Sequence, residues 1–174
     1  MWYVIQTDAG KERSVCRKCE QAFPGGSYKE IFVPGYMRLA KREGTWTEGL
    51  KVLFPGYFFV DASDPASIED VLRHYLSRIA KPVCVGDEFI PIYEDEQRFL
   101  EEMMDGDHIV RISKGDIVNG ECVLYEGPMK GRTDRIVYID RHKRSADVKV
   151  YLHGMERKIH VGLVIVSKTA GKAG

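Results

Sequence analysis

The stretch EGPMKGRTDRIVYI, residues 126–139, decides the fold of the C-terminal part of the chain, and DRHKR follows it at 140–144. It combines a Gly-Pro turn, a second glycine, a strand rich in β-branched residues and a strongly basic turn. Short apolar segments separated by turns lie on both sides of it, and a succession of short strands is typical of a small β-barrel. We expect these strands at 123–125, 135–139, 148–152, 157–161 and 163–166.

The N-terminal part mixes helices with strands. KVLFPGYFFV at 51–60 joins two apolar strands through a Pro-Gly turn, and WYVI at 2–5 forms another apolar strand. Apolar residues at helical spacing predict helices at 11–23, 65–76 and 94–104. Helices among strands, followed by strands alone, predict an α+β domain and then an all-β domain. The other expected features are a strand within 28–39, a polar hairpin tip at 41–47 and a strand pair at 83–91.

Taken together, these stretches resemble the NusG family of transcription elongation factors, and 126–144 resembles the KOW motif of that family. The resemblance covers nearly the whole chain, in the same order and with the same spacing, which makes it more specific than any single motif. It implies a NusG N-terminal domain, an α/β sandwich-like fold, followed by an SH3-like KOW barrel. The implied boundaries are an N-terminal domain at 1–105, a linker at 106–115, a KOW domain at 116–168 and a flexible tail at 169–174.

An aromatic surface is expected around the Pro-Gly turn. Alternation along the strand places Tyr57 and Phe59 on one face and Phe58 and Val60 on the other. One pair must be core, and an exposed aromatic cluster on the other face would suit protein docking. The resemblance implies that this segment binds the clamp helices of the large RNA polymerase subunit. The candidate polymerase contacts are Phe54, Pro55, Tyr57 and, from the adjacent strand, Tyr3.

Charge is unevenly distributed along a chain whose net charge is zero. Residues 1–113 hold 14 basic and 19 acidic residues, a net of −5, and residues 114–174 hold 12 and 7, a net of +5. A basic module can neutralise phosphates. The turn Arg-His-Lys-Arg is either a solvated face or a phosphate contact, and a second basic turn expected close to it favours RNA. The candidate RNA contacts are Lys130, Arg132, Arg135, Arg141, His142, Lys143, Arg144, Arg157 and Lys158.

Two further groups of residues are candidates for DNA contact and for shaping a turn. Arg38, Lys41 and Arg42 lie at the expected hairpin tip, and the resemblance implies that this region can approach the non-template DNA strand. A solvated loop is an equally good interpretation of these three cations. Glycine allows backbone angles that other residues avoid, and proline fixes its own. The residues expected to shape the KOW turn are Gly127, Pro128 and Gly131.

The sequence departs from the general NusG pattern in the second domain. Met129 stands where an aromatic residue commonly follows the Gly-Pro, and Asp134 and its neighbours stand about where the general factor has a glycine. These departures argue against ribosomal protein S10 and the Rho terminator as partners. Together with the strong basic turn, they resemble LoaP, a specialised paralogue within the family. That resemblance implies processive antitermination and recognition of an RNA hairpin in the leader transcript.

Metal, cofactor and catalytic signals are weak. Cys16 and Cys19 form one CxxC, Cys84 and Cys122 are isolated, and a structural zinc site needs four suitably placed ligands. Spacing of three on a helix favours burial of the first pair as small core residues. No G-x-S-x-G, H-E-x-x-H or phosphate-binding glycine loop occurs. We therefore expect no metal, no cofactor, no catalytic residue and no enzymatic activity.

The sequence is compatible with two alternative functions. One is a general NusG factor that couples polymerase to the ribosome or to Rho, and another is a KOW-type RNA-binding protein of translation. The LFPGY segment argues against the second alternative, because ribosomal KOW proteins lack that domain. The chain has no run of 18 apolar residues and no secretory signal. A monomeric, cytoplasmic bacterial protein, nucleoid-associated with elongating polymerase, is expected.

Overall fold

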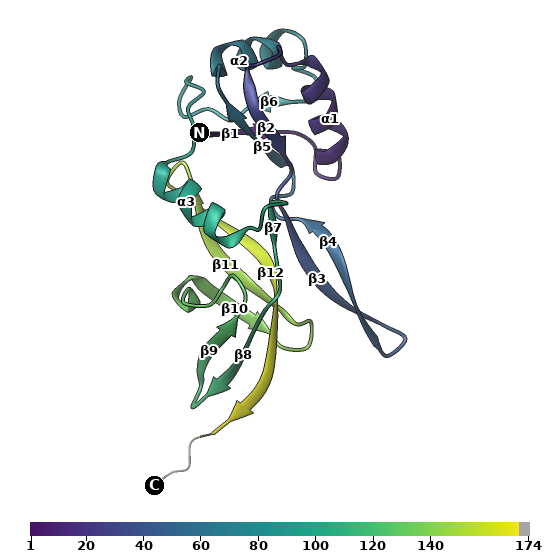
Figure 1. The fold of residues 1–174 in the computed structure, drawn as a ribbon, viewed down its shortest axis with the longest axis vertical. Coiled ribbons are helices and arrows are strands. Elements are labelled where there is room, and N and C mark those ends of the chain that lie inside the picture. Colours follow the sequence, from purple (N-terminus) through teal and green to yellow (C-terminus); the bar gives the residue numbers. More distant parts are fainter. Residues whose placement is uncertain (171–174) are drawn as a thin grey trace. The chain divides into compact units, whose positions relative to one another are not determined.

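The computed structural model describes residues 1–170, and their helices and strands form an α+β fold, as the sequence predicts (Figure 1). The chain divides into two compact units, each assembled from segments that are distant in sequence. Unit 1 comprises Met1–Pro34, Phe54–Phe99 and Leu152–Met155. Unit 2 comprises Gly35–Leu53, Leu100–Tyr151 and the described residues from Glu156 onward.

Unit 1 is built on a four-stranded sheet with the strand order β2-β5-β1-β6. The central pair, β1 (Trp2–Gln6) and β5 (Tyr57–Ala62), is antiparallel, with β2 (Tyr28–Phe32) and β6 (Lys81–Pro82) at the edges. Both faces of β5 are buried, because Phe58, Phe59 and Val60 are all fully enclosed. A strand of this composition must therefore pack on two sides.

Helices α1 (Glu12–Ala22) and α2 (Pro65–His74) lie over one face of this sheet (Figure 1). The Asp64 side chain caps α2 by accepting from the Ser67 N–H, and Pro65 occupies the first turn. The helices and the sheet share one hydrophobic core. Its buried members are Tyr3, Ile5, Val15, Cys16, Cys19, Phe23, Phe58, Val60, Ile68, Leu72 and Ala80.

Helix α3 (Glu94–Met103) begins with three acidic residues, which suit the positive end of the helix dipole. Glu96 is buried, and its carboxylate accepts from the Tyr93 N–H at 3.0 Å, which closes the first turn. The same carboxylate accepts from the backbone N–H groups of His153 at 2.8 Å and Gly154 at 2.6 Å. His153 and Gly154 form a tight turn in which both residues have positive φ. The Glu96 carboxylate holds this turn, and all three residues belong to unit 1.

Unit 2 contains a long hairpin of β3 (Gly35–Arg42) and β4 (Thr45–Val52) (Figure 1). β7 (Ile109–Val110) adds to β3 in parallel, giving the order β4-β3-β7. The two-residue turn, Glu43-Gly44, has positive φ at both positions, as a type I′ hairpin turn requires. The expected polar tip at 41–47 is therefore reduced to two residues.

A five-stranded sheet completes unit 2, in the order β10-β11-β12-β8-β9. Every second residue of β11 is buried, as expected for a sheet with one core face. β9 and β10 are the two edges of this sheet, so its closure into an SH3-like barrel stays a prediction. The elements are β8 (Ser113–Val118), β9 (Glu121–Glu126), the 3-10 turn η1 (Thr133–Arg135), β10 (Ile136–Asp140), β11 (Ser145–Leu152) and β12 (Met155–Thr169).

Several local predictions were wrong. The two strands expected at 157–161 and 163–166 form the single strand β12. The strand pair expected at 83–91 does not form, because β6 ends at Pro82 and this segment contains only an isolated bridge between Val85 and Glu88. α2 ends at His74, and Tyr75 is 78% exposed, because the chain leaves the helix before that residue can face the core.

The predicted domain boundaries stay a prediction, although strands occupy part of the expected linker. β7 and the start of β8 fall within 106–115. Of the expected tail at 169–174, Thr169 is the last residue of β12, and 171–174 lie outside the described residues.

Candidate nucleic-acid interface

The basic turn between β10 and β11 has a defined backbone. The Asp140 carboxylate accepts from the Lys143 N–H at 2.9 Å, and the Arg144 carbonyl accepts from the Leu163 N–H at 2.9 Å. Arg144 has a φ of 51°, in the left-handed region that favours glycine. A side chain there costs about 1 kcal/mol. The turn therefore keeps an arginine at a position where glycine would be less strained.

The Arg144 side chain contacts the hairpin within unit 2. Its guanidinium carbon lies 4.1 Å from the centre of the Trp46 ring on β4. A cation over a tryptophan face contributes about 0.5–1 kcal/mol at a partly exposed site. This contact joins the basic turn to the β3–β4 hairpin.

Close backbone approach brings the same two segments together. A Cβ at Gly162 of β12 would lie 2.5 Å from the Met37 carbonyl oxygen and 2.9 Å from the Ile112 side chain. Real Cβ atoms do not tolerate such contacts with backbone, so only glycine allows β12 to lie this close to β3. Gly162 thus sets the spacing between the hairpin and the five-stranded sheet.

A cavity of about 370 Å³ lies between these segments of unit 2. Burial raises the pKa of the Tyr36 hydroxyl above its ordinary value, against the opposing effect of Arg38. The cavity is lined by cations, carboxylates, tyrosines and small residues. They are Tyr36, Arg38, Leu39, Tyr138, Asp140, Lys143, Arg144, Ser145, Asp147, His160, Val161 and Gly162.

Asp147 organises one wall of the cavity. Its Oδ1 lies 2.5 Å from His160 Nδ1, and its Oδ2 lies 3.5 Å from Lys158 Nζ. The side chain of Asp147 is 20% exposed, which leaves it open to the cavity. This carboxylate can still accept further hydrogen bonds, because an ionised carboxylate has about four acceptor sites.

The structure brings together part of the predicted RNA-binding set. Lys143 and Arg144 line the cavity, and Arg141 and His142 are exposed in the same turn. Lys158 reaches the same wall through its ion pair. These five residues form the basic face that the sequence suggested at 140–144, extended by one residue of β12.

The other predicted RNA contacts have local partners. Arg132 donates to the Pro128 carbonyl at 2.8 Å and forms a 2.7 Å ion pair with Glu102. Arg135 lies 5.6 Å from the centre of the Tyr151 ring. Neither Lys130, which is exposed, nor Arg132 lines the cavity, and Arg157 is half-buried. The expected approach of the 130–135 loop to the basic turn is therefore not seen at the cavity.

The predicted DNA-contacting residues separate into two places. Arg38 lines the cavity, two positions after Tyr36 on the same face of β3. Lys41 and Arg42 are exposed beside the hairpin turn, where Lys41 pairs across the strands with Trp46. The alternation of side chains along a strand could have predicted from the sequence that Tyr36 and Arg38 share one face. The contact between Trp46 and Arg144 joins residues 98 positions apart in the numbering and carries no local signal.

The predicted turn at Gly127-Pro128 is closely packed. Gly127 has a φ of 94°, and a Cβ there would lie 2.5 Å from the Ser113 Cα. The Met129 N–H donates to Ser113 Oγ at 3.0 Å, and Met129 is fully buried. Met129 is therefore a core residue, and its identity says little about partners that bind at the surface. Gly131 also has positive φ, at 77°.

The turn at Pro55-Gly56 in unit 1 is the second candidate surface. The Gly56 N–H donates to Glu12 Oε1 at 2.7 Å, and the Gly10 N–H donates to the same carboxylate at 3.0 Å. Burial alone would raise the pKa of Glu12, but the hydrogen bonds from Gly56 and Gly10, with nearby Arg13, lower it overall. An ionised, buried Glu12 thus fixes the turn.

The expected exposure of Phe54 and Tyr3 was wrong, because each is only 5% exposed. Phe54 lies 5.6 Å from Phe59, in ring contact on the face opposite the helices. Tyr3 lies on the helix-covered face, since it pairs with Val60. Of the predicted polymerase contacts, Pro55 is exposed and Tyr57 is half-buried.

Trp2, the neighbour of Tyr3 on β1, belongs to the buried aromatic cluster on the opposite face of the sheet and is only 4% exposed. It lies 4.9 Å from Phe32 and 6.0 Å from Phe59, measured between ring centres. Strict alternation along β1 could have found this, because Trp2 and Tyr3 must face opposite sides.

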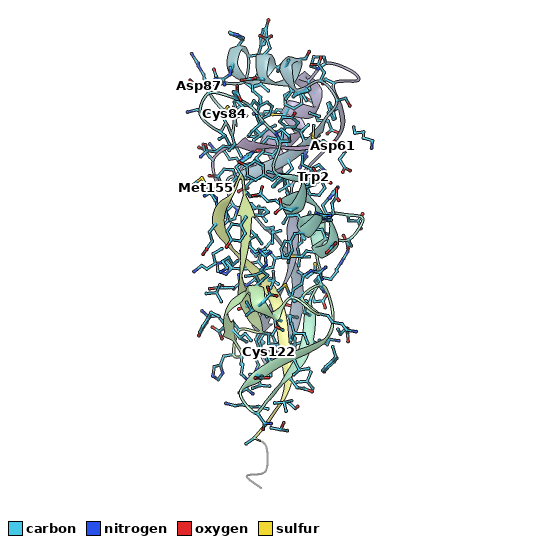
Figure 2. All side chains as sticks on the ribbon, turned by 90° about the vertical axis from the view of Figure 1, so that its left-hand side faces the viewer. Trp2, Asp61, Cys84, Asp87, Cys122 and Met155 are labelled. Carbon is cyan, nitrogen blue, oxygen red and sulfur yellow. The ribbon has the colours of Figure 1, made fainter. Side chains whose placement is uncertain are left out.

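The cysteines behave as the spacing predicts. Cys16 is 8% exposed and Cys19 is fully buried, and burial raises the pKa of their thiols to about 11 and about 12. Cys84 and Cys122 are half-buried (Figure 2). Among residues 1–170, no cluster of His, Cys, Asp and Glu is arranged to hold a metal ion. No helix in that range is both long and apolar enough to span a membrane.

The chain is a two-unit α+β protein in which a helix-covered antiparallel sheet accompanies a β-rich unit with a basic cavity. The sequence profile of NusG, described as transcription termination factor nusG, matches residues 1–101. This match spans more than half of the 174 residues, and the chain therefore belongs to the NusG family.

Two solved structures show more distant similarity. A chain of the MjSpt4:Spt5 complex in conformation A is 17% identical, with a TM-score of 0.34, over 97% of this chain and 100% of that one. A chain of the same complex in conformation B is 16% identical, with a TM-score of 0.33, over 91% and 90%. No curated protein matches the sequence significantly.

Proposed function

We propose that this protein is a transcription elongation and antitermination factor that binds RNA polymerase through its N-terminal domain and RNA through a C-terminal KOW domain. Membership of the NusG family supports the role in transcription. The observation that carries the RNA-binding role is the cavity of unit 2, where cations from the hairpin and the basic turn converge. The proposed role involves no enzymatic step.

The polymerase surface is proposed at the Pro55-Gly56 turn, facing the clamp helices of the large subunit. Pro55 is exposed and Tyr57 is half-buried, so both present apolar surface to a partner. Phe54 supports them from inside, in contact with Phe59. Glu12 holds the turn in one conformation, which limits the entropy lost on binding.

The RNA surface is proposed around the basic turn, with Arg141, His142 and Lys143 as exposed phosphate contacts. Arg38 lines the adjoining cavity. Lys41 and Arg42, at the hairpin tip, extend the basic surface towards a second nucleic-acid strand. The high positive charge of this turn supports a specialised, LoaP-like factor that recognises a leader RNA hairpin. Phosphate contacts give affinity and salt dependence, whereas sequence is read elsewhere.

The main alternative is a general factor that couples polymerase to the ribosome or to Rho. The burial of Met129 supports this alternative. Because Met129 lies in the core, its presence in place of an aromatic residue does not take away a surface that S10 or Rho could bind. A binding assay with each of these proteins separates the two functions. A KOW-type protein of translation is a weaker alternative, since the family match lies in the N-terminal 101 residues.

Co-purification with RNA polymerase tests the first half of the proposal. We expect Tyr57→Ala to reduce polymerase capture at least about tenfold, since aromatic anchors often contribute 2 kcal/mol or more. Tyr75→Ala is the matched control, because Tyr75 is 78% exposed and lies at the end of α2. Equal capture by a folded Tyr57→Ala protein and by wild type would remove this turn from the interface.

Titration with leader hairpins and a scrambled RNA tests the second half. We expect the intact chain to prefer a hairpin, with affinity that falls steeply as salt increases. Lys143→Ala should weaken binding to all RNAs alike, because its side chain is 78% exposed and is proposed to bind phosphate, not a base. Equal binding of hairpins and scrambled RNA at physiological salt would contradict the LoaP-like function.

A further inference from the structure

The cavity of unit 2 has a mixed chemistry that phosphate binding does not explain. Arg38, Lys143 and Arg144 supply three positive charges, and Asp140 and Asp147 supply two negative ones. A site for phosphate alone gains nothing from carboxylates, which repel anions and accept hydrogen bonds without donating any. Two carboxylates on the wall instead suit a ligand that carries N–H donors as well as phosphate.

Aromatic side chains line the same space. Tyr36 comes from β3 and Tyr138 from β10, and Tyr138 is 60% exposed. Unstacked bases of single strands are bound by stacking on such rings and by hydrogen bonds to their base-pairing edge. The tyrosines thus supply the stacking surface, and the carboxylates supply acceptors for a base edge.

The size of the cavity limits the ligand. About 370 Å³ lies at the lower end of the range of small-ligand sites, roughly 300–1,000 Å³. That volume suits one nucleotide and excludes a base pair. The cations at the same site, Arg38 and Lys143, are available for the phosphates that flank an extruded base.

We propose that this cavity binds one unpaired guanine nucleotide of a single-stranded RNA segment, with the Asp147 carboxylate accepting from the base. Guanine presents two neighbouring donors, N1–H and the N2 amino group, which match the two oxygens of one carboxylate. His160 and Lys158 hold Asp147 in place through the two contacts described above. The proposal rests on RNA binding by unit 2 and adds Asp147 as the residue that recognises the base.

The test uses the full chain and oligouridine of about eight nucleotides, a length typical of single-strand sites. One central uridine is replaced by guanosine or by inosine, which lacks only the N2 amino group. We expect guanosine to raise the affinity about tenfold over oligouridine, as a bidentate base contact does. Inosine should lose most of that gain.

Asp147→Asn provides the matched variant, because it keeps the shape of the side chain and replaces one acceptor oxygen with a donor. We expect it to bind the guanosine and inosine oligonucleotides equally, which a double-mutant cycle with wild type measures directly. Asp87→Asn, an exposed position in unit 1, is the control and should keep the preference. Urea unfolding of each variant verifies folding.

The outcomes separate this proposal from the proposed function. If wild type binds leader hairpins but shows no preference for guanosine over inosine, the cavity is not a guanine site and RNA binding stands. If folded Asp147→Asn keeps the full preference, another residue reads the base. If neither hairpins nor oligonucleotides bind, both proposals fail, and a protein partner becomes the better ligand for unit 2. Should Asp147→Asn not fold, the comparison of guanosine with inosine on wild type still decides the question.

Discussion

The turn at Pro55-Gly56 and the turn at 141–144 are held by different kinds of interaction. In the first, buried Glu12 accepts from the backbone of Gly56 and Gly10. In the second, the half-buried Asp140 caps the turn, and the Arg144 guanidinium lies over the Trp46 ring. Buried charge-assisted hydrogen bonds are little screened by salt, whereas exposed charges are screened strongly. The candidate protein-binding turn is thus fixed in shape, and the candidate RNA-binding turn keeps its charges available.

The largest expected effect comes from removing the buried carboxylate. Glu12→Ala leaves the N–H groups of Gly10 and Gly56 without their acceptor. We expect the free energy of unfolding to fall by about 3 kcal/mol, because the buried Gly56 N–H loses its acceptor and that acceptor is charged. Urea denaturation followed by tryptophan fluorescence measures the change. A loss below about 1 kcal/mol would mean that water replaces the carboxylate and that the two turns do not differ as described.

Acidification should affect the first turn through the same residue. The folded protein holds the pKa of Glu12 below its ordinary value, so the unfolded chain takes up the proton first as pH falls. The resulting stabilisation is complete above the unfolded pKa and is lost as pH falls through the folded pKa. We expect Glu12→Gln to flatten the part of the stability profile that lies below the ordinary pKa of a glutamate. A profile identical to that of wild type would show that other carboxylates account for the acid sensitivity.

Substitutions at positive φ should differ in the size of their effect between the two turns. Gly56 has a φ of 86°, and a Cβ there would lie 3.3 Å from the Thr7 carbonyl oxygen, so Gly56→Ala should cost about 1–2 kcal/mol. Arg144→Gly relieves about 1 kcal/mol of strain and loses about 0.5–1 kcal/mol of contact with Trp46. It should therefore be nearly neutral, whereas Arg144→Ala should be destabilising. Thermal unfolding of the three variants gives the comparison, and an Arg144→Ala protein as stable as Arg144→Gly would exclude strain at Arg144.

The smallest expected effect on stability is at Lys143. Its Nζ lies 3.9 Å from Asp140 Oδ2, and the side chain is 78% exposed. Lys143→Ala should change the free energy of unfolding by less than about 0.5 kcal/mol, because exposed pairs contribute little. The same variant should lower the slope of RNA affinity against salt by about one ion. A loss of stability without an effect on RNA binding would show that Lys143 serves to hold its turn in shape and does not bind RNA, contrary to the contrast drawn between the two turns.

Local patterns in the sequence predict much of unit 1. Apolar spacing predicts α1 and the start of α2, and Asp64 with Pro65 marks a helix start that the structure confirms. The end of α2 was missed by about two residues because Tyr75 and Leu76 continue the apolar spacing beyond the last turn of the helix. Alternation alone cannot say that both faces of β5 are covered, which depends on tertiary packing.

Unit 2 was harder to predict. The strands expected at 157–161 and 163–166 leave a gap at residue 162, whereas Gly162 permits close approach of β3 and leaves β12 continuous. The basic turn was found from sequence because its charges are adjacent. The cavity was not, because Tyr36, Asp147 and His160 come from three strands that only the fold brings together.

Burial of the CxxC has a practical consequence for labelling chemistry. With pKa values of about 11 and about 12, Cys16 and Cys19 hold almost no thiolate near neutral pH and react slowly with maleimides. Cys84 in unit 1 and Cys122 in unit 2 are the more accessible thiols of the four. The natural chain therefore carries one attachment point for a fluorophore in each unit. Energy transfer between the two dyes can follow the distance between the units during polymerase or RNA binding, without a single substitution.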